Sequence, residues 1–425
     1  MFEKLRKDCF WLSDRLFNKS VWKHYQDIKS IQNEIDYDPK ERLSRMLEYA
    51  IKHVPFYKDI SSPDLSLFPV MTKADYKRIG NDCRSIEFLD DSKLTIASTS
   101  GSTGTPLIVY QDDEKKARMR ADLIAAHENV GWNLGDHYIF IRNWVSNYKQ
   151  STIKSIAQNV ENISVTEFND SKKAFLCDHL LKHPNSVLFG YASSVCDFMN
   201  YLINIDYEAT KLKLKLMVCD SDELSSKNRQ ALESTFGCTV INRYDNEENG
   251  LLGISAPGND SFFVNRPSIY FELLKIDSDL PAQPGESGRV VVTDLYNRAM
   301  PLIRYDIGDL AVSPDEVGKI RKFTSIVGRK ADCLYSTDGK IISAVAISGL
   351  TEIFTSIVKY QLVQTTKTSF EFHYIGDIAD RDSNELLNRL ETALGSDAAI
   401  QFIKEKQIPV EKNGKYKTTV YAVKD

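Results

Sequence analysis

A short segment rich in glycine and hydroxyl side chains, TIASTSGSTGTP at residues 95–106, has the composition of an anion-binding loop. Its two glycines allow close approach of the backbone, and its hydroxyls and successive backbone N–H groups can surround phosphate oxygens. The residues concerned are Ser98, Thr99, Ser100, Gly101, Ser102, Thr103, Gly104 and Thr105. No Lys-Ser/Thr pair follows the second glycine, so this is not a Walker A loop. A flexible linker is the alternative, but a Gly/Ser linker would be longer and would not lie between two apolar strands.

A histidine pair and a run of lysines have side chains that can bind metals or act in catalysis, but their spacing alone does not indicate such a function. His179 and His183 are four residues apart, which places two imidazoles on one face of a helix. No cysteine or acidic third ligand follows at a suitable spacing, so we expect no metal at this pair. Lysines recur between residues 404 and 417. A run of charged residues of this kind usually forms a solvated surface, so the run alone does not indicate a catalytic lysine.

The elements that must position these residues follow an α/β pattern. Residues 1–60 read as helical, and residues 112–130 predict a further helix that acidic residues open and Gly131 closes. Between residues 138 and 300, short apolar runs alternate with helical stretches such as 225–236. The runs expected as buried strands are 187–191, 214–219, 238–244 and 288–295. This alternation predicts central sheets flanked by helices.

The pattern of expected strands and helices changes near residues 328–333. Two alternating strands are expected within 359–376, a helix at 384–394, and two more strands at 400–410 and 415–423. These elements form a small α+β unit. We therefore expect two domains, residues 1–328 and residues 329–425.

Composition excludes several classes of protein. The chain has 425 residues, 42% hydrophobic and 27% charged, and a net charge of −5, which argues against disorder and against a nucleic-acid partner. No apolar run is long enough to span a membrane, and the N-terminus does not have the pattern of a signal peptide. Seven dispersed cysteines with no CxxC pair favour reduced thiols and a cytoplasmic protein. The oligomeric state is not predicted.

Five segments, in order along the chain, carry a family resemblance. STSGSTGTP resembles the phosphate-binding signature of the adenylate-forming enzymes, which include the acyl-CoA synthetases and ligases. YDNEE (244–248) resembles the Tyr-Gly-x-Thr/Ser-Glu motif of that superfamily, and RYDIGDL (304–310) resembles its Tyr-Arg-Thr-Gly-Asp motif. VGRKADCLYSTDGKII (327–342) resembles the Gly-Arg-x-Asp-Asp hinge motif, and NGKYKTTV (413–420) resembles the terminal lysine motif. Five ordered matches are far more specific than any one of them.

Finer features resemble one branch of the superfamily. HVPFYKDI (53–60), LFGYASSVCDFMNYL (188–202), SDELSSKNRQALESTFG (221–237) and MPLIRYDIGDL (300–310) are similar to the phenylacetate-CoA ligase branch. That branch also holds CapK-like proteins of bacterial surface-polysaccharide gene clusters. The resemblance implies a large N-terminal adenylate-forming domain that binds ATP and the acyl group. It also implies a small mobile C-terminal lid.

The resemblance also implies roles for single residues in ATP binding and catalysis. The loop 98–105 would hold the β- and γ-phosphates of ATP, and Glu248 would bind Mg²⁺. Asp309 would accept hydrogen bonds from the ribose hydroxyls, and Arg329 would contact ribose or phosphate. Lys415, carried on the lid, would bridge the incoming carboxylate and the α-phosphate.

Further positions match the nucleotide and acyl pockets of the superfamily. Ser221, Asp222, Glu223 and Asn242 would border the adenine and Tyr244 would stack on it, while Tyr191, Trp144 and Tyr148 would line the acyl pocket. Core packing is an equal alternative for Trp144 and Tyr148. Arg304 is expected to support the site by pairing with an acid.

The sequence departs from the superfamily pattern at three positions. Asp245 replaces a glycine and Glu247 a Thr or Ser, so either Glu247 or Glu248 could hold the metal. Ala331 replaces the hinge aspartate and Asp332 follows it, so the pivot residue of the hinge is open.

The resemblance implies an AMP-forming ligase that activates a carboxylic acid with ATP and Mg²⁺ and passes the acyl group to an acceptor. The acceptor that the resemblance implies is CoA. One alternative is a CapK-like enzyme of surface-polysaccharide biosynthesis that acylates a sugar or lipid-linked acceptor. A catalytically inactive nucleotide-binding homologue is the other, and the three departures motivate it.

Overall fold

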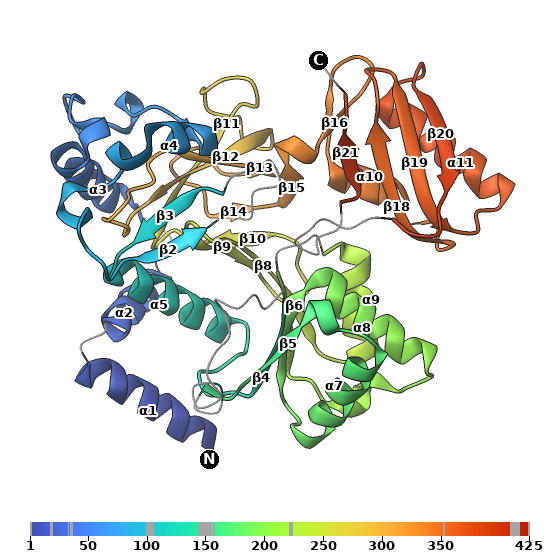
Figure 1. Ribbon diagram of the computed structural model, residues 1–425, viewed down its shortest axis with the longest axis horizontal. Helices are drawn as coiled ribbons and strands as arrows, with labels where there is room; N and C mark the ends of the chain where they lie inside the picture. The colour runs from blue at the N-terminus through green and yellow to red at the C-terminus, as the bar shows by residue number, and fades with distance from the viewer. Residues whose placement is uncertain are drawn as a thin grey trace. The chain divides into compact units, whose positions relative to one another are not determined.

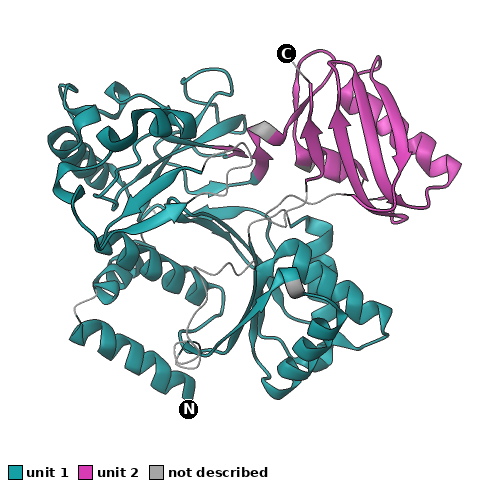
Figure 2. Cartoon of the chain, in the orientation of Figure 1, with its two compact units in different colours: residues 1–307, 313–325 teal, residues 308–312, 326–425 magenta. Residues whose placement is uncertain are grey.

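A computed structural model describes most of the chain. The described residues are 2–17, 20–32, 34, 37–98, 106–142, 155, 158–220, 224–351, 353–408 and 417–423. They form two compact units, coloured separately in Figure 2: residues 1–307 with 313–325, and residues 308–312 with 326–425. The division into domains at residues 328 and 329 stays a prediction.

The larger sheet of the first unit has eight strands in the order β14-β10-β9-β8-β7-β6-β4-β5 (Figure 1). The strands from β5 to β8 run parallel, and β8, β9, β10 and β14 run antiparallel. Their bounds are β4 (Tyr138–Arg142), β5 (Val160–Ser164), β6 (Val187–Tyr191), β7 (Leu216–Asp220), β8 (Thr239–Asn246), β9 (Gly250–Ser255), β10 (Phe262–Val264) and β14 (Lys322–Phe323). The strands expected at 187–191, 214–219 and 238–244 are confirmed.

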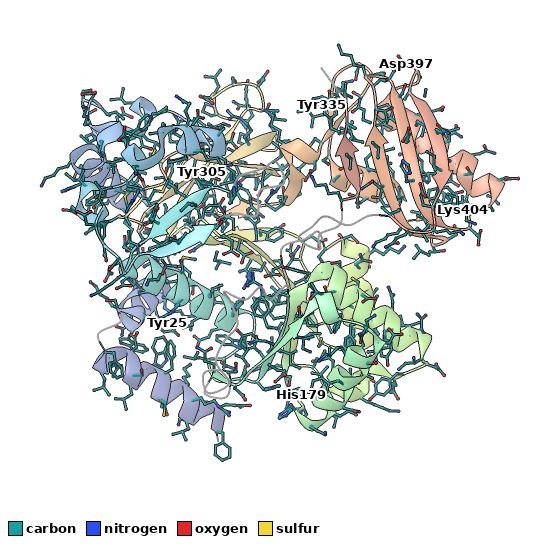
Figure 3. All side chains as sticks on the ribbon, in the orientation of Figure 1. Tyr25, His179, Tyr305, Tyr335, Asp397 and Lys404 are labelled. Carbon is teal, nitrogen blue, oxygen red and sulfur yellow. The ribbon has the colours of Figure 1, made fainter. Side chains whose placement is uncertain are left out.

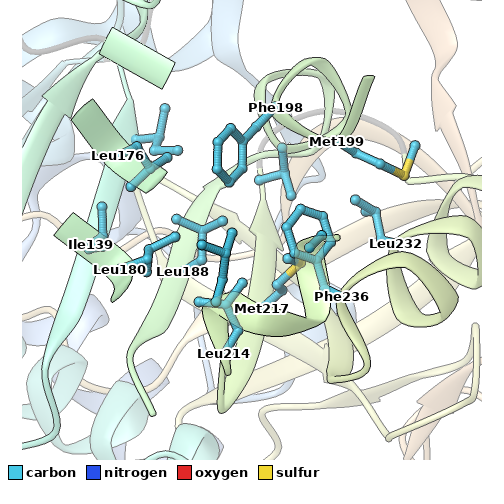
Figure 4. Packing of buried hydrophobic residues seen from close by; sticks show 14 of the residues in the cluster. Ile139, Leu176, Leu180, Leu188, Phe198, Met199, Leu214, Met217, Leu232 and Phe236 are labelled. Atoms are coloured by element: carbon cyan, nitrogen blue, oxygen red, sulfur yellow. The ribbon is translucent and has the colours of Figure 1, made fainter. Parts of the chain in front are cut away.

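The parallel strands are apolar on both faces because both faces are covered. Helices α7 (Asp170–Lys182), α8 (Ala192–Asn204) and α9 (Ser226–Phe236) lie along one side of them in Figure 1. Figure 4 shows Leu188 and Met217 from the strands packed with Phe198 and Phe236 from the helices. The helix expected at 225–236 is confirmed as α9, whose first turn Ser225 caps by accepting a hydrogen bond from the backbone N–H of Asn228.

A second sheet has the order β1-β13-β12-β11, and β15 pairs with β13. Its bounds are β1 (Met71–Thr72), β11 (Ile269–Leu274), β12 (Ser287–Asp294), β13 (Tyr305–Val312) and β15 (Ser325–Arg329). The strand expected at 288–295 is confirmed as β12. Helices α3 (Lys40–His53) and α4 (Lys73–Ile79) belong to the same unit, and residues 308–312 of β13 belong to the second unit.

A two-stranded hairpin, β2 (Thr95–Ser98) with β3 (Ile108–Gln111), precedes helix α5 (Asp113–Asn129). The helix expected at 112–130 is therefore confirmed, and Asp112 caps it by accepting a hydrogen bond from the N–H of Lys115 at 2.8 Å. Helices α1 (Phe2–Leu16) and α2 (Val21–Gln32) pack near it through a shared apolar cluster. The first 60 residues are thus largely helical, as expected.

The second unit holds a four-stranded sheet in the order β20-β19-β18-β21. Its elements are β16 (Leu334–Tyr335), β17 (Ile341–Ile342), α10 (Ala344–Thr351), β18 (Ile357–Gln364), β19 (Ser369–Gly376), α11 (Asp380–Leu394), β20 (Ala399–Lys404) and β21 (Thr419–Tyr421). Buried leucines of α11 pack on β18 and β19. The small α+β unit is confirmed.

Short 3-10 helices join these elements: η1 (Pro55–Tyr57), η2 (Leu65–Leu67), η3 (Gly80–Cys83), η4 (Ile86–Phe88), η6 (Val165–Glu167), η7 (Ala209–Leu212) and η8 (Lys330–Asp332). Among the helices in the described part of the chain, none has both the length and the apolar character needed to cross a bilayer.

Candidate active site

The carboxyl ends of four parallel strands lie at one edge of the larger sheet. Strands β4, β6, β7 and β8 end at Arg142, Tyr191, Asp220 and Asn246. Ligands of open α/β sheets bind at this edge, because the loops that leave the strands gather there. The strand ends therefore locate the candidate site within the first unit.

Two arginines and three acids form ion pairs at this edge. The guanidinium of Arg243 pairs with the carboxylates of Asp220 and, at 2.9 Å, of Asp245. Arg142 Nη2 lies 3.5 Å from Glu247 Oε1. The two acids that depart from the superfamily pattern are thus each matched by an arginine.

Burial has its clearest effect in this cluster on the carboxyl group of Asp245. It raises the pKa of Asp245 to about 6, against the opposing attraction of Arg243, and the nearby Asp220 adds to the rise. Arg243 lies with its guanidinium carbon 4.4 Å from the centroid of the Phe189 ring, which gives the cation an apolar partner.

Glu248 and Glu247 differ sharply in environment. Glu248 is buried, and Tyr305 Oη donates a hydrogen bond to its Oε1 at 3.2 Å. The Glu247 side chain is 48% exposed and turns to Arg142. The buried Gln111 amide donates to the backbone carbonyls of both glutamates, at 3.2 Å and 3.0 Å. Strand β3 therefore fixes the turn from which Glu248 projects.

A fully buried ion pair supports the same turn from α5. Lys115 Nζ lies 2.6 Å from Asp294 Oδ2, and both side chains have no exposure. The same ammonium donates to the carbonyl oxygen of Asn249 at 2.8 Å, and Asn246 Oδ1 accepts from the N–H of Asn249 at 2.7 Å. Residues 246–249 are thus held by side chains from β3, α5 and β13.

Ser98 lies on the hairpin that reaches this turn. It is the last residue of β2 and pairs with Ile108 of β3, and Thr95 of β2 pairs with Gln111. The hairpin therefore connects the start of the expected phosphate loop to the backbone of Glu248. The other expected loop residues, Thr99, Ser100, Gly101, Ser102, Thr103, Gly104 and Thr105, lie outside the described residues.

The residues expected around the adenine and the acyl group are described only in part. The Asn242 N–H donates to Ser255 Oγ at 2.8 Å. Tyr244 packs edge-on against Phe262 and Phe323, with ring centroids 6.1 Å and 6.5 Å away. Tyr191 is half-buried at the end of β6. Ser221, Asp222, Glu223, Trp144 and Tyr148 lie outside the described residues.

Arg304 confirms one expectation from the sequence. Its Nε and Nη2 donate to the two carboxylate oxygens of Glu272 at 3.1 Å and 3.0 Å, and its Nη1 donates to the carbonyl of Phe68 at 3.0 Å. Burial raises the pKa of Glu272 and the guanidinium opposes that rise. Arg304 thus pairs with an acid and ties β13 to β11, next to Tyr305.

In the second unit, the two expected ribose contacts lie together. Arg329 Nε is 3.8 Å from Asp309 Oδ1, on the paired strands β15 and β13. In the hinge segment, Lys417 Nζ donates to Asp332 Oδ1 at 2.6 Å, and Thr419 Oγ1 donates to the Asp332 carbonyl at 2.6 Å. Lys415 lies outside the described residues.

Comparison with solved structures decides the fold. The structure matches 2-hydroxyisobutyryl-CoA ligase in the postadenylation state, in complex with R3-HIB-AMP, with a TM-score of 0.70 at 17% identity. The match covers 91% of this chain and 88% of the ligase. The chain has the fold of the adenylate-forming CoA ligases. ATP-bound MatB from Rhodopseudomonas palustris also matches, with a TM-score of 0.56 at 16% identity over 76% of this chain and 66% of MatB.

Relatives of the adenylate-forming fold match in sequence as well. Residues 334–421 match the model of the CapK C-terminal domain. The chain is 23% identical to Protein CapK of Staphylococcus aureus, over 97% of this chain and 96% of that protein. It is 24% identical to a phenylacetate-coenzyme A ligase of Aromatoleum evansii, over 72% of this chain and 73% of that protein. The expected resemblance to the phenylacetate-CoA ligase and CapK-like branch is confirmed.

The adenylate-forming fold implies a magnesium ion, and the donor chemistry at the turn fits one. Mg²⁺ takes oxygen ligands, usually one or two carboxylates with substrate phosphates and water. Glu248 supplies a carboxylate held in place by Tyr305, while the Glu247 carboxylate is engaged by Arg142. The assignment of the metal to Glu248 stays a prediction, as do the other roles implied by the motifs.

Sequence reasoning missed Gln111, Lys115, Asp294 and Tyr305, which position the turn. Tyr305 lies inside the RYDIGDL segment, so its neighbours in that motif were a usable signal. Lys115 and Asp294 are 179 positions apart, and no local spacing connects them.

Proposed function

We propose that this protein is an AMP-forming ligase that activates a carboxylic acid with ATP. The observation that supports this most is the fold match over 91% of the chain to a ligase in complex with an acyl-adenylate. In the first unit, the buried Glu248 is held beside the hairpin that begins the expected phosphate loop. Adenylation would need a metal-binding carboxylate and a phosphate-binding loop close together, and the contact between this hairpin and the Glu248 turn supports the proposal.

In the proposed first step, a carboxylate oxygen of the substrate attacks the α-phosphorus of ATP and pyrophosphate leaves, which gives an acyl-adenylate. Two anions must meet, and their repulsion at about 4 Å rises from about 1 kcal/mol in water to about 4 kcal/mol near a protein surface. The protein must therefore supply positive charge and fixed geometry. Loop 98–105 would hold the β- and γ-phosphates, and Lys415 would bridge the two reacting anions.

Several described residues would orient the nucleotide. Glu248 would hold Mg²⁺, which when bound neutralises phosphate charge. Asp309, with Arg329 next to it, would accept the ribose hydroxyls, since one carboxylate can take two such bonds. Tyr244 would face the adenine.

In the second step, a nucleophilic acceptor attacks the acyl carbonyl carbon, AMP leaves, and the acceptor loses its proton. CoA is the proposed acceptor, because relatives in sequence and in structure are CoA ligases. Tyr191, with Trp144 and Tyr148, would line the acyl pocket.

A second acceptor class is favoured by one observation. Protein CapK matches 97% of the chain, whereas the phenylacetate-coenzyme A ligases match 72% and 69%. On this alternative, the acyl group passes to a sugar or lipid-linked intermediate of surface-polysaccharide assembly. Release of AMP that depends on an amino-sugar acceptor, and not on CoA, would distinguish it.

The test is ATP–pyrophosphate exchange with a panel of aryl, acyl and amino acids. We expect exchange with at least one acid, a loss of exchange in Lys415→Ala, and a fall of about 10²-fold or more in Glu248→Gln. Glu247→Gln is the matched control, one residue away and paired with Arg142, and we expect exchange within about threefold of the native rate.

One result would contradict the proposed activity, and another would contradict the proposed metal ligand. Binding of ATP without exchange for any acid would support the inactive homologue. An exchange loss in Glu247→Gln but not in Glu248→Gln would move the metal to the other glutamate.

A further inference from the structure

Three histidines meet at the surface of the first unit, away from the candidate active site. His179 lies in the last turn of α7, His183 is the residue that follows the end of this helix, and His137 directly precedes β4. Their ring nitrogens offer one atom each, all within 4.8 Å of one another. Figure 3 shows His179 well apart from Tyr305. Sequence spacing offered no third ligand for His179 and His183, but the fold supplies one, His137, from 42 positions before His179.

The tautomer of His137 follows from its hydrogen bonds. Ser186 Oγ lies 2.5 Å from the carbonyl oxygen of His183, to which it donates its single proton. The same Oγ lies 2.7 Å from His137 Nδ1, so it must accept a hydrogen bond from that nitrogen. The proton of neutral His137 is therefore on Nδ1, and Nε2 carries a lone pair. An outer hydrogen bond of this kind is what orients histidine ligands in metal sites.

One distance between the rings, that between His137 and His179, suits a tetrahedral ion. His137 Nε2 and His179 Nε2 are 3.4 Å apart. Two nitrogens each about 2.0–2.1 Å from a tetrahedral zinc ion are separated by about 3.3–3.4 Å. The rings of His179 and His183 lie one helical turn apart with centroids 4.5 Å from each other. The His183 ring also stacks on the His137 ring, with centroids 4.5 Å apart, so it must rotate to turn a nitrogen toward the ion, and its exposure to solvent leaves room for this rotation.

Burial favours the neutral form of two of the three imidazoles, those of His137 and His179. Burial lowers the pKa of His137 to about 4, with further lowering by the two other histidines and by Arg6 of α1. Burial also lowers the pKa of His179, and His183 and Lys182 add to this while Glu161 of β5 opposes it. Neutral imidazole is the form that binds a metal ion.

We propose that His137, His179 and His183 form a binding site for a zinc-class transition-metal ion, with water as the fourth ligand. The ligands come from the residue before β4, from the last turn of α7 and from the residue after α7, so the bound ion would tie this helix to the parallel sheet. The role is structural, because the site shares none of its residues with the adenylation machinery.

The test uses the full-length protein after treatment with a chelator. Zinc titration by calorimetry and by thermal unfolding is expected to give one tight site per chain and a rise in Tm, because an ion bound only by the folded state stabilises it. Co²⁺ in place of zinc is expected to give the visible absorption of a tetrahedral site. His179→Ala and His183→Ala should each weaken zinc binding at least tenfold and abolish that absorption.

Matched controls separate this site from the cysteines. Asp178→Ala changes an exposed residue of the same helix, and Cys9→Ser removes an exposed thiol. Both variants are expected to bind zinc as the native protein does. Absence of zinc binding by the native protein, or unchanged affinity in both histidine variants, would overturn the proposal. ATP–pyrophosphate exchange is expected to be kept in His183→Ala, so failure here is distinct from failure of the proposed ligase activity.

Discussion

Replacing Lys115 by methionine tests the support of the Glu248 turn. The native ammonium lies 2.6 Å from Asp294 Oδ2, with both side chains fully buried, and it also donates to the carbonyl of Asn249. Methionine has a similar length and no charge. The substitution therefore removes one ionic contact and one hydrogen bond without opening a large cavity.

The magnitude follows from what is left behind. Two unit charges 2.6 Å apart attract by about 6 kcal/mol at an effective dielectric constant of about 20, and burial of each charge costs several kcal/mol. Removing one partner of a buried pair typically costs about 3–5 kcal/mol. Asp294 keeps two donors, since its Oδ1 accepts from the N–H groups of Tyr296 at 2.9 Å and Asn297 at 3.2 Å. We therefore expect Lys115→Met to lower the free energy of unfolding by about 3 kcal/mol, the lower end of this range.

Tryptophan fluorescence during urea unfolding measures this loss in the right unit, because all four tryptophans lie among residues 1–307. Lys116→Met is the matched control: its lysine is partly exposed and pairs with Asp113, which is 79% exposed, so the change should stay within about 0.5 kcal/mol. The double variant Lys115→Met/Asp294→Leu should recover part of the loss, because it removes the stranded carboxylate. Equal effects of Lys115→Met and Lys116→Met would refute the reasoning.

Two other substitutions test the same region. Burial raises the pKa of Asp245 to about 6, so between pH of about 4 and about 6 the folded chain binds more protons than the unfolded chain and its stability falls as pH rises. Asp245→Asn should flatten this pH dependence of the urea unfolding midpoint. An unchanged slope in Asp245→Asn would contradict this expectation. Tyr305→Phe removes the hydroxyl that donates to Glu248, which should cost about 1–3 kcal/mol and raise the Mg²⁺ concentration needed for half-maximal exchange. An unchanged Mg²⁺ dependence in Tyr305→Phe would separate the tyrosine from the proposed metal.

Periodicity and turn residues predicted most of the fold. The run VLFGY is apolar at every position, which is typical of a strand covered on both faces, and it is β6 in the structure. Ser225 and Gly237 bound α9, since a hydroxyl caps its start and a glycine at φ 66° ends it. Such signals are local, so one sequence is enough to read them.

The residues that hold the candidate site in place could not be predicted from local patterns, because they join segments that are far apart in the sequence. Nothing in the residues around Lys115 distinguishes it from Lys116, yet one is fully buried against Asp294 and the other is partly exposed. His137 likewise has no sequence relation to His179. Only the register of β4 in the sheet and the position of α7 bring the two rings together.

The structure shows that the two extra acids of YDNEE, Asp245 and Glu247, are each paired with an arginine. Three carboxylates in five residues would repel each other and the phosphates of a nucleotide if all were unneutralised. Asp245 is paired with Arg243, and Glu247 is paired with Arg142 from the end of β4. Each of the two departures thus has an arginine partner, and Arg243 is shared between Asp245 and Asp220. The same pairing weakens the case that these departures abolish turnover, because it leaves the backbone of Glu248 held by Gln111 and its carboxylate bonded to Tyr305.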